Sequence, residues 1–230
     1  MKLVVLDKNH PTQPFPPLRN ALRDPNGLLA VGGCLSSERL LNAYKQGVFP
    51  WFSHDDPILW WSPNPRLVLF PEKLQISKRL AKTIRQKKFD VTTNQAFDSV
   101  ISKCAELRAD KEGTWISNDI QNAYSKLHQE GFAHSFEAWH DGKLVGGLYG
   151  IMLGKVFFGE SMFHTVSDAS KVAFAYCVEQ LKMHDFQLID CQVHSEHLVS
   201  LGAEEISRAA FADLLTAHCT DEMAITATII

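Results

Sequence analysis

The stretch AHSFEAWHDGKLVGGLYG, residues 133–150, decides the fold of this 230-residue chain. It consists of two apolar runs on either side of Asp141-Gly142, a dipeptide that favours the tight turn between antiparallel strands. A third apolar run of strand length, KVFFGESMF, occupies residues 155–163. The sequence therefore predicts three successive strands, of which the first two form a hairpin.

A helix and one more strand follow these three strands. Residues 167–184, SDASKVAFAYCVEQLKMH, have an amphipathic pattern that Ser167 or Asp168 opens. Residues 187–193, QLIDCQV, again have the length and apolar bulk of a strand. Antiparallel strands followed by a helix and a further strand are the order of an acyltransferase-like core. The predicted fold class is therefore α+β, a mixed α/β fold.

A smaller unit is expected before this core. Ser36 as a cap and Gly47 as a stop bound a short helix. Residues 47–66, GVFPWFSHDDPILWWSPNPR, then contain three tryptophans and four prolines. Because proline fixes φ and removes a backbone donor, this aromatic segment is expected to be stiff and irregular, without a helix or a central strand. The predicted division is a small N-terminal domain, residues 1–65, and a larger domain, residues 66–230.

Residues 73–90, KLQISKRLAKTIRQKKFD, are predicted to form one helix with an apolar stripe and a basic face. No acid lies between Lys73 and Lys88, so no acidic neighbour along the helix relieves the repulsion between its cations. The basic face is either solvated or a binding site for phosphate groups. Its seven cations are Lys73, Lys78, Arg79, Lys82, Arg85, Lys87 and Lys88.

Three further helices are predicted from caps and periodicity. The first begins at Phe97 and runs to about Ala105, and the second begins at the cap Ser117. A closing helix is expected after Ser207. Helices therefore precede and follow the predicted strands along the chain.

Composition and charge narrow the class of protein. The net charge is −3, which gives no global basic field, and no apolar run approaches the length of a membrane span. The four apolar residues before Asp7 are too few for the core of a signal peptide. A cytoplasmic protein without membrane contact is expected.

The cysteines and histidines do not predict a metal site. No CxxC pair and no HExxH pattern occurs, and His194 and His197 are the closest histidine pair. An odd, scattered set of cysteines indicates free thiols in a reducing compartment. The five are Cys34, Cys104, Cys177, Cys191 and Cys219.

Two acids lie inside apolar strands, where acids are rare unless they are paired with a cation, hydrogen-bonded or part of a functional site. They are Glu160 in VFFGESMF and Asp190 in LIDCQV. Side chains alternate along a strand, so Asp190 and Gln192 are expected on one face and Ile189 and Cys191 on the other. Each acid is either a buried group that has its hydrogen-bond partners within the protein or part of a functional site.

Several common motifs are missing. The chain has no GxSxG nucleophile elbow, no GxxxxGK[ST] phosphate loop and no GxGxxG dinucleotide loop. Acyltransferases that use coenzyme A hold its pyrophosphate on a glycine-rich turn before the long helix. The turn in this chain is FHTVSDASK, which contains no glycine. An acyl donor other than coenzyme A is therefore expected.

A set of motifs from about Asn26 to Phe211 resembles the bacterial leucyl/phenylalanyl-tRNA–protein transferase family. In chain order they are FPWFS, PILWWSPNPR, EGTWI, GGLYG, GESMF, ASK, LIDCQV and LGAEEISR. The resemblance implies a small N-terminal domain and a larger N-acetyltransferase-like domain. It implies transfer of leucine or phenylalanine, and weakly methionine, from charged tRNA to proteins that begin with arginine or lysine. This transfer marks the protein for degradation by the N-end rule pathway.

The resemblance also assigns site residues. Trp51 and Trp115 would border the terminal adenosine of the tRNA, while Trp60 and Trp61 are expected to hold the small domain on the large one. An apolar pocket for the transferred side chain would be lined by Leu148, Phe157, Met162, Phe174, Cys177, Leu181 and Ile189. The catalytic or peptide-recognising residues would be Glu160, Asp190 and Gln192. With tRNA as the donor, the basic face of residues 73–90 is expected to hold the tRNA backbone, through Lys78, Arg79, Lys82, Arg85, Lys87 and Lys88.

The aminoacyl ester is already activated, so amide formation needs no ATP and no cofactor. The hypothesis for the mechanism is that Asp190 polarises Gln192, whose side-chain carbonyl accepts a hydrogen bond from the attacking amine. Glu160 is assigned to the arginine or lysine side chain of the acceptor. A monomer is expected.

Three rival functions stay open at this point. A coenzyme A N-acetyltransferase is favoured by the strand order and disfavoured by the glycine-free turn. A non-catalytic tRNA-binding module would use the basic helix and the aromatic segment without chemistry. A cell-wall aminoacyltransferase fed by tRNA would differ in its acceptor.

Overall fold

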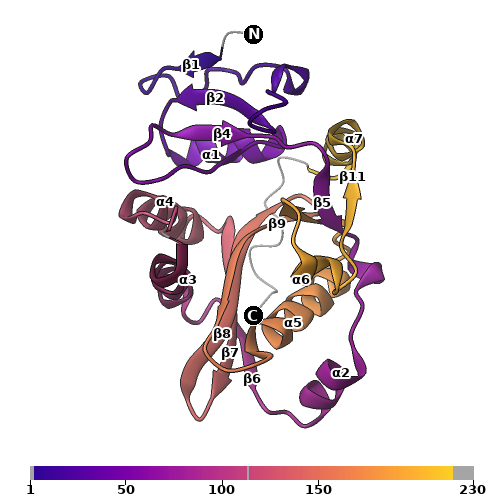
Figure 1. The fold of residues 1–230 in the computed structure, drawn as a ribbon. Coiled ribbons are helices and arrows are strands. Elements are labelled where there is room, and N and C mark those ends of the chain that lie inside the picture. Colours follow the sequence, from indigo (N-terminus) through magenta and orange to yellow (C-terminus); the bar gives the residue numbers. More distant parts are fainter. Residues whose placement is uncertain (1–2, 113, 220–230) are drawn as a thin grey trace.

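The computed structural model describes residues 3–112 and 114–219. These residues form two β-sheets and the helices that cover them (Figure 1). The strands are β1 Val4–Leu6, β2 Leu28–Gly32, β3 Phe49–Pro50, β4 Leu59–Trp61, β5 Arg66–Leu69, β6 Asp90–Thr93, β7 Ala133–His140, β8 Lys143–Leu153, β9 Val156–His164, β10 Leu188–Gln192 and β11 Glu204–Ile206. The α-helices are α1 Ser37–Lys45, α2 Lys78–Arg85, α3 Phe97–Glu112, α4 Asn118–Gln129, α5 Ala169–Met183, α6 Glu196–Val199 and α7 Arg208–His218.

The smaller sheet has the strand order β1-β2-β4-β3 and lies at the top of Figure 1. Strand β4 is an interior strand, so the expectation that the aromatic segment contains no central strand is wrong. The reason is local: residues 58–61 carry no proline, and Pro57 and Pro63 lie outside the strand. Proline therefore bounds β4 without removing any of its own N–H donors.

The larger sheet has the order β11-β5-β10-β9-β8-β7-β6. Strands β7, β8 and β9 pair antiparallel in succession, and β9 and β10 pair parallel through the crossover helix α5. The hairpin between β7 and β8 turns at Asp141 and Gly142, whose φ values are 51° and 70°. The predicted strands, the crossover helix and the mixed α/β fold class are confirmed.

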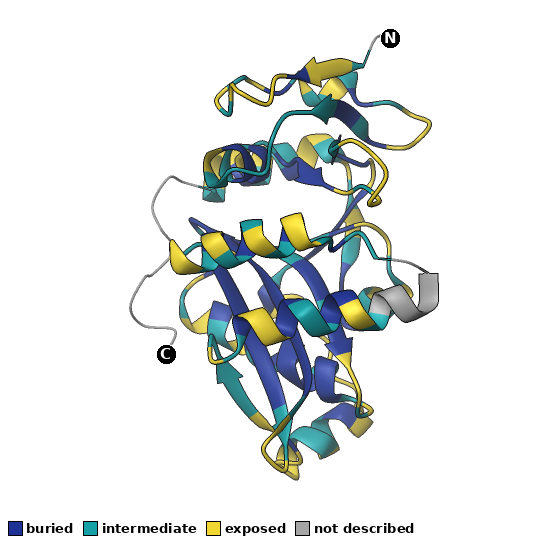
Figure 2. Cartoon of the chain, turned by 90° about the vertical axis from the view of Figure 1, so that its left-hand side faces the viewer, coloured by how far each residue is buried: buried dark blue, intermediate teal, exposed yellow. Residues whose placement is uncertain are grey.

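Helices cover both faces of the larger sheet. Helices α3 and α4 lie on the face of Phe158 and Leu188, and α5 lies on the face of Phe157 and Ile189. In Figure 2 the strands are dark blue behind helices whose outer residues are yellow. Alternate residues of β9 and β10 therefore enter two separate cores.

The capping serines act as the sequence predicts. The side chains of Ser36, Ser117 and Ser207 each accept a hydrogen bond from a backbone N–H in the first turn of α1, α4 and α7. Helix α3 extends beyond Ala105 to Glu112. At α5 the cap residue is Asp168, which has φ 70° and makes no capping hydrogen bond through its side chain.

The single basic helix predicted for residues 73–90 is wrong in length. Helix α2 spans eight residues and carries four of the seven cations, while Lys73 lies in a 3-10 turn and residues 87 and 88 follow the helix. Acids distant in sequence also relieve the repulsion. Lys73 Nζ lies 2.6 Å from Glu204 Oε1, and Arg79 Nε lies 3.4 Å from Asp168 Oδ2.

The smaller sheet uses residues up to Trp61, and the larger sheet begins at Arg66. That residues 65 and 66 form a domain boundary stays a prediction, and residues 220–230 of the predicted second domain lie outside the described residues.

Within residues 3–112 and 114–219, no helix combines the length and apolar character needed to cross a bilayer. The same residues bring together no group of three His, Cys, Asp or Glu side chains fit to hold a metal ion.

Gly150 makes the contact between β8 and β9 possible. A Cβ at this position would lie 2.3 Å from the carbonyl oxygen of Phe158 and 2.5 Å from Cζ of Phe157. We expect Gly150→Ala to lower the free energy of unfolding by about 3 kcal/mol, because two backbone strands must move apart. At the turn residue Gly142 a Cβ meets nothing within 4 Å. Gly142→Ala should cost only about 1 to 2 kcal/mol, from its positive φ, and equal losses in urea denaturation would contradict this difference.

Candidate active site

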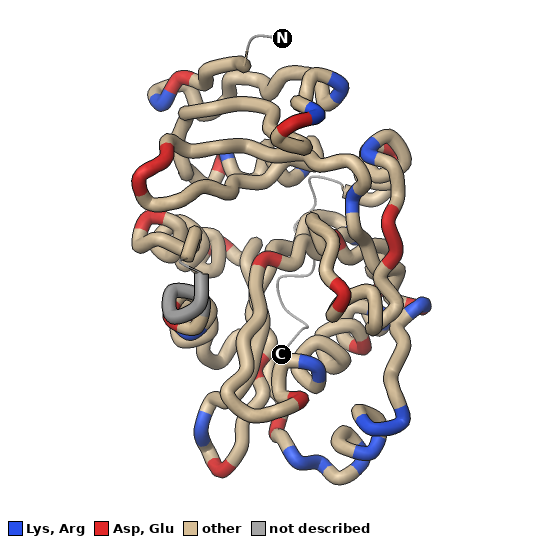
Figure 3. The backbone as a smooth tube through the Cα atoms, in the orientation of Figure 1, with Lys and Arg blue, Asp and Glu red and all other residues tan. Residues whose placement is uncertain are grey.

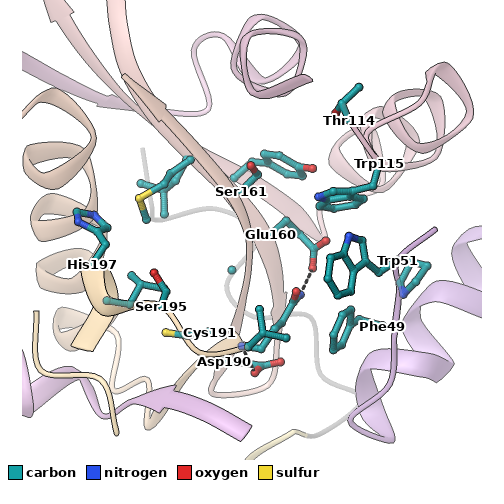
Figure 4. Close-up of a pocket in the computed structure, with 18 of the residues that line it drawn as sticks. Phe49, Trp51, Thr114, Trp115, Glu160, Ser161, Asp190, Cys191, Ser195 and His197 are labelled. Carbon is teal, nitrogen blue, oxygen red and sulfur yellow. Dashed lines mark hydrogen bonds between the residues drawn. The ribbon is translucent and has the colours of Figure 1, made fainter. Parts of the chain in front are cut away.

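Strands β9 and β10 part at the centre of the larger sheet. Their parallel pairing ends at Asp190 and Phe158, and the register of β10 against β5 then shifts at a bulge. Gln192, which has φ 66°, follows just beyond the last registered pair of these strands. A cavity of about 680 Å³ opens beside this point (Figure 4).

One wall of the cavity is apolar. Leu148 on β8, Met162 on β9, Phe174 on α5 and Ile189 on β10 line it, as the resemblance implies. The other expected pocket residues, Phe157, Cys177 and Leu181, are not among the lining residues. They are fully buried in the core on the α5 side of the sheet, so they support the wall from behind.

Asp190 is completely buried and paired with an arginine. Arg66 donates from Nε to Oδ1 at 2.8 Å and from Nη2 to Oδ2 at 2.6 Å. The guanidinium also lies 4.8 Å and 4.6 Å from the ring centroids of Phe49 and Phe211, and donates to the carbonyl of Gly47. The Asp190 charge is therefore compensated inside the protein and is not free for the substrate.

Gln192 is held at both its backbone and its side chain. Its backbone N–H donates to Asp190 Oδ1 at 2.9 Å, and its amide Nε2 donates to Glu160 Oε1 at 2.8 Å (Figure 4). Asp190 thus contacts the backbone of Gln192, while Glu160 holds the amide. The hypothesis that Asp190 polarises this amide needs correction, because the direct partner of the amide is Glu160.

Glu160 is 9% exposed and lies among hydroxyl groups. Tyr44 Oη lies 2.7 Å from Oε1, and Tyr124 Oη lies 3.0 Å from Oε2. Burial raises the pKa of Glu160 to about 8, and the Asp190 charge adds to the rise, while its hydrogen bonds with Tyr44, Tyr124 and Gln192 oppose it. Burial, followed by the neighbouring Glu160, raises the pKa of both tyrosines as well.

Two tryptophans stand on the opposite side of the cavity from Ser195 and His197 (Figure 4). Trp51 is 44% exposed and follows β3, and Trp115 precedes α4. Trp61 donates from Nε1 to the carbonyl of Trp51 at 2.6 Å, so it positions Trp51.

Trp60 is fully buried in the N-terminal part of the chain. It donates to the carbonyl of Gly32, and its ring meets Phe15 edge-on at 5.1 Å. The expectation that Trp60 and Trp61 hold this part on the larger sheet stays a prediction. Tyr44 makes a contact of that kind, since its ring lies 5.1 Å from that of Phe158 on β9.

Sequence reasoning does not identify Arg66, Tyr44 and Tyr124 as site residues. Tyr44 and Tyr124 fit the apolar periodicity of α1 and α4, so their hydroxyls give no separate signal. Arg66 gives one available signal, because an arginine opens the apolar run RLVLF that forms β5. A buried cation at the start of a strand needs an acidic partner that offsets the cost of its burial, and Asp190 in LIDCQV is a candidate for that partner.

The basic residues predicted to bind tRNA lie apart from the polar centre, which is the group formed by Glu160, Asp190 and Gln192. Figure 3 shows them in blue on α2 and the segment after it, at the end of the molecule away from the smaller sheet. Arg79 joins α2 to the start of α5 through Asp168 and Ser167. An acid at the N-terminal cap of α5, Asp168, disfavours a pyrophosphate there, in agreement with the glycine-free turn.

Comparison with known proteins shows to which family the chain belongs. A family model described as leucyl/phenylalanyl-tRNA protein transferase matches residues 68–216, and a model of the N-terminal domain of that family matches residues 33–64. A protein of this name from Methylococcus capsulatus is 56% identical over 216 residues, 94% of this chain and 92% of that protein. The chain belongs to the leucyl/phenylalanyl-tRNA–protein transferase family.

Other relatives agree with this family. A leucyl/phenylalanyl-tRNA–protein transferase from Pseudomonas fluorescens is 57% identical over 204 residues, 89% of this chain and 90% of that protein. The crystal structure of FemX has a TM-score of 0.50 and 9% identity, and covers 77% of this chain and 70% of that chain. At this identity FemX shows a shared fold alone. The resemblance read from the motifs and the enzyme class, a transferase, are confirmed.

Removal of one partner of the buried Arg66–Asp190 pair should strongly destabilise this transferase. Arg66→Met leaves the Asp190 carboxylate buried without its cation, which costs about 3 to 5 kcal/mol. We expect urea denaturation to show this loss, and the double variant Arg66→Met/Asp190→Leu to recover much of it because neither charge remains. Lys73→Met removes the exposed pair with Glu204 and should cost less than about 1 kcal/mol. A double variant no more stable than Arg66→Met would contradict the assignment.

Proposed function

We propose that this chain transfers leucine or phenylalanine, and weakly methionine, from charged tRNA to the N-terminal α-amino group of proteins that begin with arginine or lysine. Membership in the transferase family supports the reaction class. The observation that carries the proposal is the Gln192 amide, which is fixed on the wall of an apolar cavity that two tryptophans border. The product would enter degradation by the N-end rule pathway in the cytoplasm.

The cavity offers a place for each part of the donor. The adenine of the tRNA end is placed between Trp51 and Trp115, where stacking contributes about 1 to 3 kcal/mol per base. The leucine or phenylalanine side chain enters the apolar wall formed by Leu148, Met162, Phe174 and Ile189. An apolar pocket distinguishes side chains by about 1 to 3 kcal/mol per methylene, which explains why methionine is accepted weakly.

The reaction then needs orientation and the loss of one proton. The acceptor amine attacks the ester carbonyl carbon, the C–O bond to the ribose breaks, and a proton passes from the amine nitrogen to the released ribose oxygen. The Gln192 carbonyl accepts a hydrogen bond from the attacking N–H and directs the nitrogen lone pair at the ester. Positioning of both substrates contributes about 7 to 11 kcal/mol to the lowering of the barrier.

The cationic side chain of the acceptor is placed at the cavity mouth. Among the described acids that line the cavity, Asp190 pairs with Arg66 and Glu160 holds Gln192 and two tyrosines. Asp55 also lines the cavity, and its side chain is fully exposed. The acceptor's arginine or lysine is therefore assigned to Asp55 in place of Glu160.

The transfer assay tests the whole proposal. The purified chain is mixed with radiolabelled leucyl-tRNA and peptides that differ only in their first residue, and parallel reactions contain labelled acetyl-coenzyme A. Label should pass from tRNA to peptides that begin with arginine or lysine and not to one that begins with alanine. Transfer from acetyl-coenzyme A would support the acetyltransferase rival, and binding of tRNA without any transfer would support the non-catalytic module.

Gln192→Ala isolates the step assigned to the amide. We expect turnover to fall by about 10²-fold, in the range of a positioned proton-handling group, with leucyl-tRNA affinity unchanged. Gln187→Ala is the matched control, since Gln187 is exposed on the loop before β10 and outside the cavity lining. Turnover of Gln192→Ala at the parental rate would remove Gln192 from the mechanism.

The basic residues of α2 are proposed to hold the tRNA backbone, together with Lys87 and Lys88. Neutralising Lys78, Arg79, Lys82 and Arg85 should weaken tRNA binding and reduce the slope of log affinity against log salt by about 0.7 to 0.9 for each phosphate that the variant no longer neutralises. Lys126→Gln serves as control, because Lys126 lies on α4 and pairs with Glu130. An unaltered salt slope in the quadruple variant would exclude this role.

A further inference from the structure

Tyr44, Tyr124 and Glu160 form a closed ring of hydrogen bonds beside the cavity. Tyr44 Oη contacts Glu160 Oε1 at 2.7 Å, and Tyr124 Oη contacts Glu160 Oε2 at 3.0 Å. The two hydroxyls also hydrogen-bond each other. The three groups come from α1, α4 and β9, and both tyrosines are fully buried.

The ring requires a definite number of protons. Each hydrogen bond contains one proton, so the contacts between these described side chains need three. The two tyrosine hydroxyls supply two, and an ionised carboxylate supplies none. The ring is complete when Glu160 carries the third proton as a carboxylic acid.

Gln192 fixes the direction of the ring. Because its Nε2 donates to Glu160 Oε1, that oxygen is best used as the carbonyl acceptor, and the acid proton belongs on Oε2. The order is then Oε2–H to Tyr124, Tyr124 to Tyr44, and Tyr44 to Oε1. Oε1 accepts from both Tyr44 and Gln192.

We infer that Glu160 works as a neutral carboxylic acid, and that Tyr44 and Tyr124 are positioning residues that hold it in the orientation which turns the Gln192 carbonyl toward the substrate. This inference rests on the proposed aminoacyl transfer and replaces the charged role first assigned to Glu160.

The groups around Glu160 are consistent with a neutral acid. Tyr44 faces it from α1, Tyr124 from α4 with Tyr149 of β8 behind, and Gln192 and Asp190 from β10. Arg66, the cation that contacts Asp190, is already paired with that carboxylate. Burial, the largest cause, raises the pKa of Glu160 to about 8, so the acid form dominates at neutral pH and is lost as the pH rises through that value.

A neutral Glu160 favours the chemistry. The acceptor α-amino group has a reference pKa of about 7.7 to 8 and reacts as the free amine. An uncompensated carboxylate beside the amine would stabilise its ammonium form and raise that pKa. With Glu160 protonated and Asp190 paired, the polar centre holds no net charge, and the amine gives up its proton more readily.

Glu160→Gln and Glu160→Ala test the charge. Glutamine is neutral, can accept from Tyr44 and Gln192 through its carbonyl, and can donate to Tyr124. We expect Glu160→Gln to keep kcat within about threefold of the parent, inside the span of one hydrogen bond, and Glu160→Ala to lose far more. The parent should lose kcat above pH 8, after correction for amine ionisation, while Glu160→Gln should not. A folded Glu160→Gln as inactive as Glu160→Ala would overturn the inference.

Tyr44→Phe and Tyr124→Phe test the positioning role. Each should lower kcat by a factor of about 2 to 10, the effect of one hydrogen bond, without a change in leucyl-tRNA affinity, and each should shift the alkaline limb of the pH profile. Tyr176→Phe is the control, because Tyr176 lies on α5 outside the cavity lining. Unchanged kcat and pH profile in both ring variants would contradict the role.

Infrared difference spectroscopy tests whether the Glu160 carboxyl group carries a proton, and it needs no substrate. The carbonyl band of a carboxylic acid should be present one unit below pH 8, disappear one unit above it, and be absent from Glu160→Gln at both. No such band in the folded parent would overturn the inference even if aminoacyl transfer is observed. A band in a protein that fails to transfer leucine would leave the neutral acid in place and reject the proposed function instead.

Discussion

A buried ion pair between Arg66 and Asp190 fixes the point at which strands β9 and β10 separate. Both side chains are almost completely buried, so their mutual contact and the rings of Phe49 and Phe211 must compensate their lost hydration. The pair ties β5 to β10, and Asp190 also holds the backbone N–H of Gln192 in its left-handed conformation. The cavity lies where the registered pairing of β10 with β9 ends while β9 continues to His164.

The polar groups of this centre come from five separate elements of the chain. Tyr44 belongs to α1, Arg66 to β5, Tyr124 to α4, Glu160 to β9, and Asp190 and Gln192 to β10. Arg66 compensates the charge of Asp190. The proton that the ring of hydroxyls requires removes the charge of Glu160. An apolar wall and an uncharged polar edge therefore meet, which suits the reaction of an activated ester with a free amine.

Local signals predict much of the fold. Asp141-Gly142 specifies its turn through the φ values it tolerates, and Ser36, Ser117 and Ser207 specify helix starts through hydrogen bonds within one turn. The motifs identify Glu160, Asp190 and Gln192 as candidates, and the structure brings all three to one cavity. Their partners cannot be read in the same way, since Arg66 is 124 residues from Asp190 and Tyr44 is 116 residues from Glu160. The ion pairs of Lys73 with Glu204 and of Arg79 with Asp168 likewise join residues that are distant in sequence.

The most direct measurement is a crystal structure of the chain with a stable amide analogue of leucyl-adenosine. We expect adenine between Trp51 and Trp115, the leucine side chain against Leu148, Met162, Phe174 and Ile189, and the carbonyl group beside the Gln192 amide. An analogue whose leucine lies outside this cavity, or whose carbonyl is remote from Gln192, would contradict this assignment of the active site.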